Sequence, residues 1–135
     1  MNNRFMLRAL ELARKGKTTP NPMVGAVLVK NNRIIAEGFH SRAGGPHAEV
    51  VALRKAGDKA RGADLYVNLE PCCHIGRTPP CTDAIIQSGV TRVFAGMKDP
   101  NKLMKGKGIR ILKAAGIKVP AGMMKKNCEK LNEVF

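Results

Sequence analysis

The chain has 135 residues, a length that suits one compact domain and leaves no room for a second domain of ordinary size. Hydrophobic residues make up 44% of the sequence and charged residues 25%, which is ordinary globular usage and excludes intrinsic disorder. Lysine and arginine number 24 against 10 aspartate and glutamate residues, so the formal net charge of +14 suits an anionic partner.

The predicted elements begin with a helix and a hairpin. Apolar residues recur at helical spacing over residues 3–15, and Gly16 supplies a stop signal. The segment TTPNP (18–22) has the composition of a turn. Two β-rich runs follow over residues 23–30 and 33–40, joined by an Asn-Asn pair that tolerates positive φ. The sequence therefore predicts one helix followed by an antiparallel hairpin.

After the hairpin, helical and β-rich segments alternate. The predicted helices cover residues 47–56, 80–88, 108–115 and 123–132, and the predicted strands cover residues 63–69, 92–96 and 117–119. Such alternation favours parallel strands connected by crossover helices. We therefore expect an α/β fold, a three-layer α/β/α sandwich with a mixed central sheet, formed by a single domain over residues 1–135.

The composition also limits the classes of partner. No segment reaches the roughly 18 apolar residues that a membrane span needs, so no membrane association is expected. Proteins that bind single-stranded nucleic acid usually stack bases on aromatic side chains, whereas this chain has four phenylalanines, one tyrosine and no tryptophan. The positive charge fits nucleic acid, phosphorylated metabolites or a salt-requiring host about equally, and the scarcity of aromatic residues makes nucleic acid the second candidate.

Three of the four cysteines crowd into ten residues, and this distribution is unlike a disulfide framework. Cys72, Cys73 and Cys81 form the cluster, while Cys128 stands alone near the end of the last predicted helix and suits a small buried hydrophobe. The sequence therefore predicts reduced thiols and a cytoplasmic location.

Reactive side chains concentrate in two short segments, HAE at 47–49 and PCCHIGRTPPC at 71–81, and both open predicted helices. The unpaired N–H groups and positive dipole at a helix start favour thiolate, the form of cysteine that binds metal. His47 and two of the cysteines would give Zn²⁺ three protein ligands and leave the fourth position for water, which is the pattern of a catalytic zinc site. Glu49 could reach that water as a general acid and base if the metal lies ahead of the helix N-terminus.

An H-x-E sequence followed by P-C is the signature of zinc deaminases that act on cytosine and adenine. In this chain the eight residues CHIGRTPP separate Cys72 from Cys81, where that signature has two. With this longer insert, the segments NPMVGAVLV, HAEVVAL, LEPCCHIGRTPPCTDAI and GVTRVFAGMKDPN resemble the deaminase domain of bacterial riboflavin biosynthesis, the diaminohydroxyphosphoribosylaminopyrimidine deaminase family. The resemblance covers essentially the whole chain and implies a cytidine deaminase-like fold.

The resemblance implies a role for each residue of the cluster. It assigns the zinc ligands to His47, Cys72 and Cys81, and the proton-carrying role to Glu49. Cys72 directly follows a Glu-Pro pair, the place where the family carries its ligand, so the neighbouring Cys73 is not implied as a ligand.

The same resemblance implies a small phosphorylated pyrimidine as the substrate and a homo-oligomer of at least two chains. Substrate contacts are implied for Asn21, His40 and Arg77, with Arg77 as the partner of the 5′-phosphate. Bifunctional relatives continue into a reductase domain, which we do not expect in these 135 residues, nor do we expect NADPH binding. The chain departs from the family in one loop, where DPNKLMKGKG stands in place of the common DPNP.

Other interpretations stay open beside this one. A purely structural zinc site would need a fourth ligand such as Cys73 or His74. A tRNA adenosine deaminase, or a cytidine or cytosine deaminase, would share the chemistry, and a zinc-stabilised RNA-binding module would use the positive charge instead. The KGKG sequence at 105–108 resembles a phosphate-binding loop but lacks P-loop spacing, so we expect a solvated loop.

Overall fold

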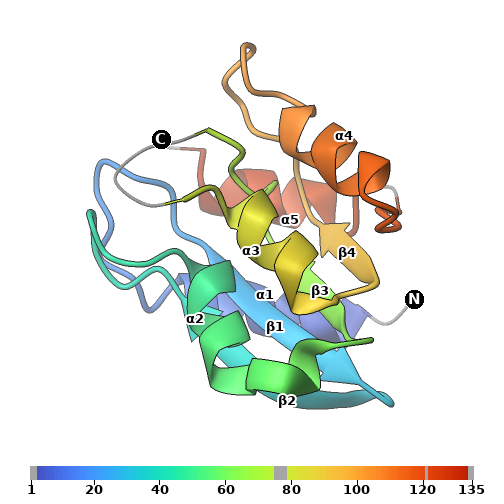
Figure 1. Cartoon of the computed structure of the whole chain (residues 1–135). Coiled ribbons are helices and arrows are strands. Elements are labelled where there is room, and N and C mark those ends of the chain that lie inside the picture. The colour runs from blue at the N-terminus through green and yellow to red at the C-terminus, as the bar shows by residue number, and fades with distance from the viewer. Residues whose placement is uncertain (1–2, 75–78, 121, 134–135) are drawn as a thin grey trace.

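The computed structural model describes residues 3–74, 79–120 and 122–133. Within these residues the chain forms a four-stranded sheet with helices packed on both faces (Figure 1). In chain order the elements are α1 (Asn3–Ala13), β1 (Gly25–Lys30), β2 (Arg33–Phe39), α2 (Ala48–Ala56), the 3₁₀ helix η1 (Gly57–Ala60), β3 (Asp64–Val67), α3 (Cys81–Ser88), β4 (Arg92–Ala95), α4 (Lys107–Ala114) and α5 (Lys125–Leu131).

The sheet is mixed, with the strand order β2-β1-β3-β4. β1 runs antiparallel to both β2 and β3, whereas β3 and β4 run parallel to each other. Asn31 and Asn32 join β1 to β2 with φ angles of 52° and 61°, so the predicted hairpin and its turn are confirmed.

Alternating side chains of the strands build two apolar cores, one on each face of the sheet. Ala26 and Leu28 of β1 face the core beneath α2, α3 and α4, whereas Val27 and Val29 face α1 and α5. In Figure 1, α2 and α3 lie in front of the sheet and α1 lies behind it. The predicted three-layer sandwich with a mixed sheet is therefore the observed fold.

Two glycines let helices lie directly against the hairpin. A Cβ added at Gly25 of β1 would collide with the backbone of Ala9 on α1. On the other face of the sheet, a Cβ added at Gly38 of β2 would collide with the backbone of Ala48 on α2. These close approaches hold α1 and α2 against opposite faces of the hairpin.

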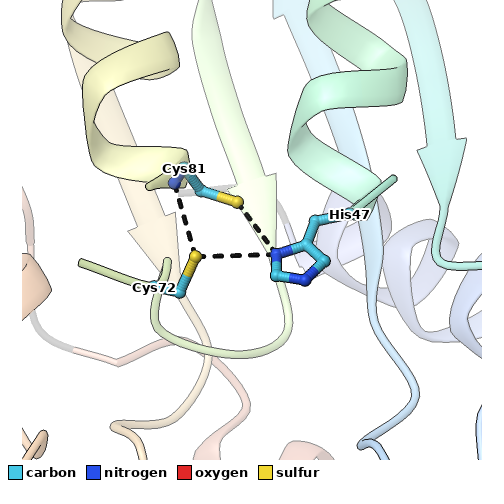
Figure 2. A group of neighbouring side chains, drawn as sticks. All are labelled: His47, Cys72 and Cys81. Carbon is cyan, nitrogen blue, oxygen red and sulfur yellow. Dashed lines mark hydrogen bonds between the residues drawn. The ribbon is translucent and has the colours of Figure 1, made fainter. Parts of the chain in front are cut away.

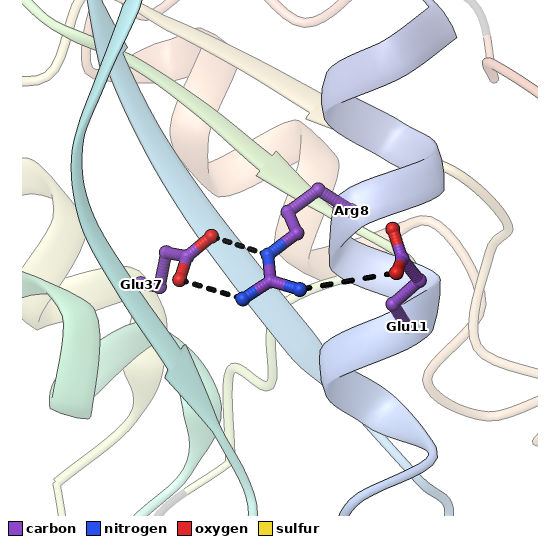
Figure 3. A network of polar contacts seen from close by, with 3 residues as sticks. All are labelled: Arg8, Glu11 and Glu37. Atoms are coloured by element: carbon purple, nitrogen blue, oxygen red, sulfur yellow. Dashed lines mark hydrogen bonds and ion pairs between the residues drawn. The ribbon is translucent and has the colours of Figure 1, made fainter.

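A polar contact also joins α1 to the hairpin (Figure 3). Arg8 of α1 donates two hydrogen bonds of 2.6 and 3.0 Å to the carboxylate of Glu37 on β2, and it lies 3.9 Å from Glu11. The hydrogen bonds from Arg8 lower the pKa of Glu37, and the same contact raises the pKa of Arg8. Because both oxygens of the carboxylate are engaged, the pair fixes the orientation of α1 on the hairpin.

Two helices begin one residue later than the sequence predicts. His47 precedes α2 and Pro80 precedes α3 as N-caps, with ψ angles of 157° and 145° that lie outside the helical region. No helix in the described part of the chain is long and apolar enough to cross a membrane.

The predicted strand over 117–119 is reduced to one isolated parallel bridge between Lys118 and Arg92 of β4. Gly116, with a φ of 89°, and Pro120 bracket this run. A segment of three residues between a left-handed glycine and a proline is too short to form a regular ladder.

Candidate active site

A pocket of about 370 Å³ lies where β1 begins and β3 ends. Its wall includes Val24, just before β1, and Leu69, just after β3. Its polar lining comes from α2 and from several loops, and it consists of Asn21, His40, His47, Glu49, Glu70, Cys72, His74 and Asp99. Segments far apart in the sequence therefore converge on one cavity, which contains most of the predicted site residues.

His47, Cys72 and Cys81 form a compact group beside this pocket (Figure 2). The Nδ1 atom of His47 lies 3.2 Å from the Sγ atom of Cys81 and 3.5 Å from the Sγ atom of Cys72. The three potential ligand atoms all lie within 4.8 Å of one another, close enough to hold one metal ion. Because His47 caps α2 and Cys81 opens α3, the group lies ahead of two helix N-termini, as expected from the sequence.

The surroundings of this group favour a thiolate. The backbone N–H of Cys81 donates to the Sγ atom of Cys72 at 3.3 Å. Hydrogen bonds from the side chains of Cys81 and His47 lower the pKa of Cys72 to about 4, and the contact with Cys72 raises the pKa of both partners. Two sulfur atoms and one imidazole nitrogen form a donor set that fits Zn²⁺.

Glu49 lies in the first turn of α2 and is 3% exposed. Burial raises the pKa of its carboxyl to about 7, against the opposing effect of its own backbone N–H. A carboxyl with a pKa near neutrality can both accept and donate a proton at physiological pH. Glu49 lines the pocket without belonging to the metal-ligand group, so its position suits an acid–base residue.

His40 and Asn21 line the same pocket. His40 is buried, and its Nδ1 atom donates to the carbonyl oxygen of Pro46 at 3.0 Å. In the neutral ring this bond leaves Nε2 as the acceptor nitrogen, and the Nδ2 atom of Asn21 lies 3.5 Å from it. The ring of His40 also packs edge-on against His47, with 5.2 Å between centroids. The structure thus brings two of the three predicted substrate contacts together, and the third, Arg77, lies outside the described residues.

Cys73 and His74 are the alternative ligands that a structural metal site would use. His74 is exposed and lines the pocket, and burial raises the pKa of the Cys73 thiol. Within the described residues, neither side chain places a ligand atom in the group of His47 and its two cysteines. The geometry therefore favours three protein ligands over four.

Three buried polar residues near the pocket lie outside the sequence-based prediction. Asn68 donates to the carbonyl oxygen of Met23 at 3.0 Å and accepts from the N–H of Gly25 at 2.8 Å. Asn132 donates to the same carbonyl at 2.9 Å and accepts from the N–H of Met23 at 2.8 Å. The third residue, Glu70, accepts hydrogen bonds from three backbone N–H groups. Only Glu70 carries a sequence signal, since it stands two residues before a predicted metal ligand.

A family model described as "Cytidine and deoxycytidylate deaminase zinc-binding region" matches residues 1–97. The matched segment contains the whole metal-ligand group and the buried carboxyl beside it. The chain belongs to this deaminase family. The zinc-binding description of the family agrees with the donor set that the group presents.

The chain is similar to much longer riboflavin biosynthesis proteins. A RibD protein of Synechocystis is 57% identical over 132 residues, which cover 96% of this chain and 36% of that protein. A RibD structure from Acinetobacter baumannii has a TM-score of 0.96 at 52% identity, covering 98% of this chain and 38% of that chain. A Thermotoga maritima structure, named a diaminohydroxyphosphoribosylaminopyrimidine deaminase/5-amino-6-(5-phosphoribosylamino)uracil reductase, has a TM-score of 0.93 at 51% identity, covering 98% and 39%. The chain therefore spans less than two-fifths of the length of these relatives.

For two structures of lower identity, the similarity extends over most of this chain and most of the matched chain. Aspergillus oryzae Rib2 deaminase, solved in complex with DARIPP, is 25% identical with a TM-score of 0.80, covering 97% of this chain and 89% of that chain. A structure from a study of tRNA:A34 deaminases is 27% identical with a TM-score of 0.73, covering 96% and 99%. The deaminase fold alone therefore does not decide between a small molecule and a tRNA as the substrate.

Proposed function

We propose that this chain is a zinc-dependent hydrolase that deaminates 2,5-diamino-6-ribosylamino-4(3H)-pyrimidinone 5′-phosphate and releases ammonia. The observation that carries this proposal is the buried carboxyl of Glu49, which shares a pocket with the His47–Cys72–Cys81 group. The choice of substrate is supported by identities above 50% to RibD proteins over nearly the whole of this chain.

His47, Cys72 and Cys81 would hold the zinc ion. The thiolate character of Cys72 supports this role, and three protein ligands are the number typical of catalytic zinc sites. When bound, zinc supplies a water molecule whose pKa is lowered toward neutrality.

Glu49 carries the protons of the reaction. Its carboxylate takes a proton from the attacking water and delivers it to the ring nitrogen beside the amine-bearing carbon. Glu49 then takes the remaining proton from the hydroxyl group that the water has added to the carbon and passes it to the departing amine, so ammonia leaves as the carbon–oxygen double bond forms. The pKa of about 7 suits both transfers, since the carboxyl neither holds its proton too tightly nor releases it too readily.

Asn21, His40 and Arg77 would contact the substrate. The amide of Asn21 and the Nε2 atom of His40 offer donor and acceptor groups inside the pocket, which suits the polar edge of a pyrimidine. The guanidinium of Arg77 suits the 5′-phosphate, and this assignment rests on the sequence.

A parallel assay separates the candidate substrates. Zinc-loaded protein is incubated with the diaminopyrimidinone ribosyl phosphate, with cytidine and with a tRNA anticodon hairpin, and ammonia release is measured. We expect release from the ribosyl phosphate alone. A protein that holds one zinc ion per chain but releases ammonia from none of the three would contradict the proposal.

A tRNA adenosine deaminase is the second candidate, favoured by the structural likeness to a tRNA:A34 deaminase and by the net charge of +14. RNA binding through lysine and arginine weakens steeply with salt because phosphate neutralisation releases counterions. Ammonia release from the hairpin, together with binding that falls between 50 and 200 mM salt, would establish this function instead.

We further propose that the chain works as a single deaminase domain, as a homo-oligomer of at least two chains, in the cytoplasm. The thiols of Cys72 and Cys81 must stay reduced to bind metal, which suits a reducing compartment. Sedimentation velocity of the zinc-loaded protein measures the assembly, and a species with the mass of one chain would contradict the oligomer.

A further inference from the structure

Glu70 is a buried carboxylate that the proposed chemistry does not use. It follows β3, is 5% exposed and stands two residues before Cys72. Its Oε1 atom accepts the N–H groups of Asp99 and Gly106, both at 2.9 Å, and its Oε2 atom accepts the N–H of Ile109 at 3.1 Å. One side chain therefore joins the loop that carries Pro71 and Cys72, called here the metal-ligand loop, to a segment 29 to 39 residues further along the chain.

Two glycines bring the start of α4 to this carboxylate. Gly106, the N-cap of α4, has a φ of 80°, a conformation that glycine adopts without steric cost. At Gly108, a Cβ would collide with the carbonyl oxygen of Pro71 in the metal-ligand loop. The KGKG sequence is thus solvated only at its lysines, because both glycines are buried next to Glu70. The positive end of α4 already faces a carboxylate from within the chain.

The same carboxylate fixes one wall of the pocket. Asp99 and Pro100 line the pocket together with Glu70 and Cys72. Glu70 accepts the N–H of Asp99 with its side chain and donates its own backbone N–H to the carbonyl oxygen of Met97 at 2.8 Å. Since one residue separates Glu70 from the metal ligand, a single side chain sets the position of this wall relative to the metal-ligand group.

We infer that Glu70 is a positioning residue for the substrate, because its carboxylate holds the Asp99–Pro100 wall at a fixed position relative to the metal ligands. This inference rests on the proposed deaminase function. Glu70 acts through the backbone that it holds and takes no part in proton transfer. Loss of its carboxylate releases the wall and weakens substrate binding, and it leaves the acid–base role of Glu49 in place.

The substitution Glu70→Ala tests this inference. Alanine removes both accepting oxygens, so none of the three backbone N–H groups keeps its acceptor, whereas the amide oxygen of a glutamine can still accept from Asp99 and Gly106. We expect KM to rise about tenfold while kcat changes by less than about threefold, the pattern of lost binding rather than lost chemistry. Zinc content stays at one ion per chain. Amide hydrogen exchange at residues 99, 106 and 109 becomes faster, whereas exchange within α3 does not.

Two further variants support the interpretation. Glu37→Gln is the matched control, because it removes a carboxylate from an ion pair that does not line the pocket. We expect it to leave KM and the exchange of residues 99–109 unchanged. Gly108→Ala pushes α4 away from Pro71 and is expected to raise KM in the same way, which keeps the test informative if Glu70→Ala fails to fold.

An unchanged KM in folded, zinc-loaded Glu70→Ala protein would overturn the inference. Loss of zinc from both the Glu70 and the Gly108→Ala variants would also overturn the inference, because Glu70 would then support the metal-ligand loop rather than the Asp99–Pro100 wall. If the unaltered protein releases no ammonia, the proposed function fails instead. In that case, slow exchange at residue 99 that survives the substitution would still contradict the role given to Glu70.

Discussion

Burial is the largest cause of the raised pKa of the Glu49 carboxyl. An ionised carboxylate loses solvation when it is buried, so its pKa rises, here to about 7. The same carboxyl on the surface would be almost fully ionised at neutral pH and would be a poor proton donor. The first turn of α2 therefore supplies both the place and the acidity that the proposed proton transfers need.

Replacing Glu49 by Gln removes the proton carrier while keeping the volume of the side chain. We expect kcat to fall by about 100-fold or more, since general acid–base catalysis contributes about 10²- to 10⁴-fold. Zinc should remain at one ion per chain, because Glu49 is outside the ligand group. Metal analysis and ammonia release measure the two quantities. Normal turnover by the folded, zinc-loaded variant would rule out this role for Glu49.

The adjacent cysteines offer a matched pair of variants. Cys72→Ser removes the thiolate that contacts His47 and Cys81, so we expect zinc to be lost on dialysis against a weak chelator. Cys73→Ser should keep zinc and activity, because Cys73 lies outside the ligand group. Zinc loss from the Cys73 variant as well would revive a four-ligand structural site.

Metal ligands and the pocket wall differ in how far the sequence can predict them. A metal site at His47 and two of the cysteines could be predicted because reactive residue types cluster in two short segments, and the family resemblance singled out Cys72 and Cys81. The role of Glu70 could not be predicted from residue types, because its partners are backbone N–H groups that any residue other than proline provides. The role of Asn132 could not be predicted for the same reason, since its side chain binds the backbone of Met23, 109 residues away in the sequence.

At the scale of helices and strands, hydrophobic periodicity predicts the order of elements and misses some of their ends. α1 was predictable because its apolar residues recur at helical spacing, and the hairpin was predictable because an Asn-Asn pair joins two β-rich runs. The run at 117–119 has β-rich composition but forms a single bridge, because ladder formation depends on tertiary pairing beyond the local sequence. His47 lies outside α2 as its cap, and this one-residue difference directs its side chain toward the two cysteines (Figure 2).

The ion pair between Arg8 and Glu37 should contribute to stability in a pH-dependent way. Because Arg8 lowers the pKa of Glu37 in the folded protein, the contribution is present above the ordinary carboxyl pKa of 4.5 and is lost as the pH falls through the lowered value. Glu37→Gln should therefore reduce the free energy of unfolding by about 0.5–1 kcal/mol at pH 7.

Urea denaturation of the protein and of its Glu37→Gln variant tests this expectation. The difference between their unfolding free energies should narrow as the pH is lowered from 7 toward 4 and below, because protonation removes the charge of Glu37 from the unaltered protein. A difference that stays constant over this range would show that the ion pair does not stabilise α1 on the hairpin.

Across the whole molecule, the group of His47, Cys72 and Cys81 lies apart from the two apolar cores. The cores lie on both faces of the sheet, whereas the group is built from a helix cap, a loop and a helix start beside the pocket. A chain of this length buries about two-thirds of its unfolded surface, enough for a stable core without metal. We therefore expect the fold to form without metal and metal binding to add to its stability.

Removal of zinc by a chelator should consequently lower the melting temperature without unfolding the protein at 25 °C. A ligand present at about 100 times its Kd stabilises the folded state by about 2.7 kcal/mol, and this corresponds to roughly 10 °C for a domain of this size. Circular dichroism should show unchanged secondary structure at 25 °C and an earlier thermal transition, which returns to its original position when zinc is restored. Small domains held by a structural zinc ion behave differently, because they unfold when the metal is removed. Unfolding on chelation would therefore assign a structural role to the His47–Cys72–Cys81 group, whereas a folded, inactive, zinc-free protein is what the catalytic role requires.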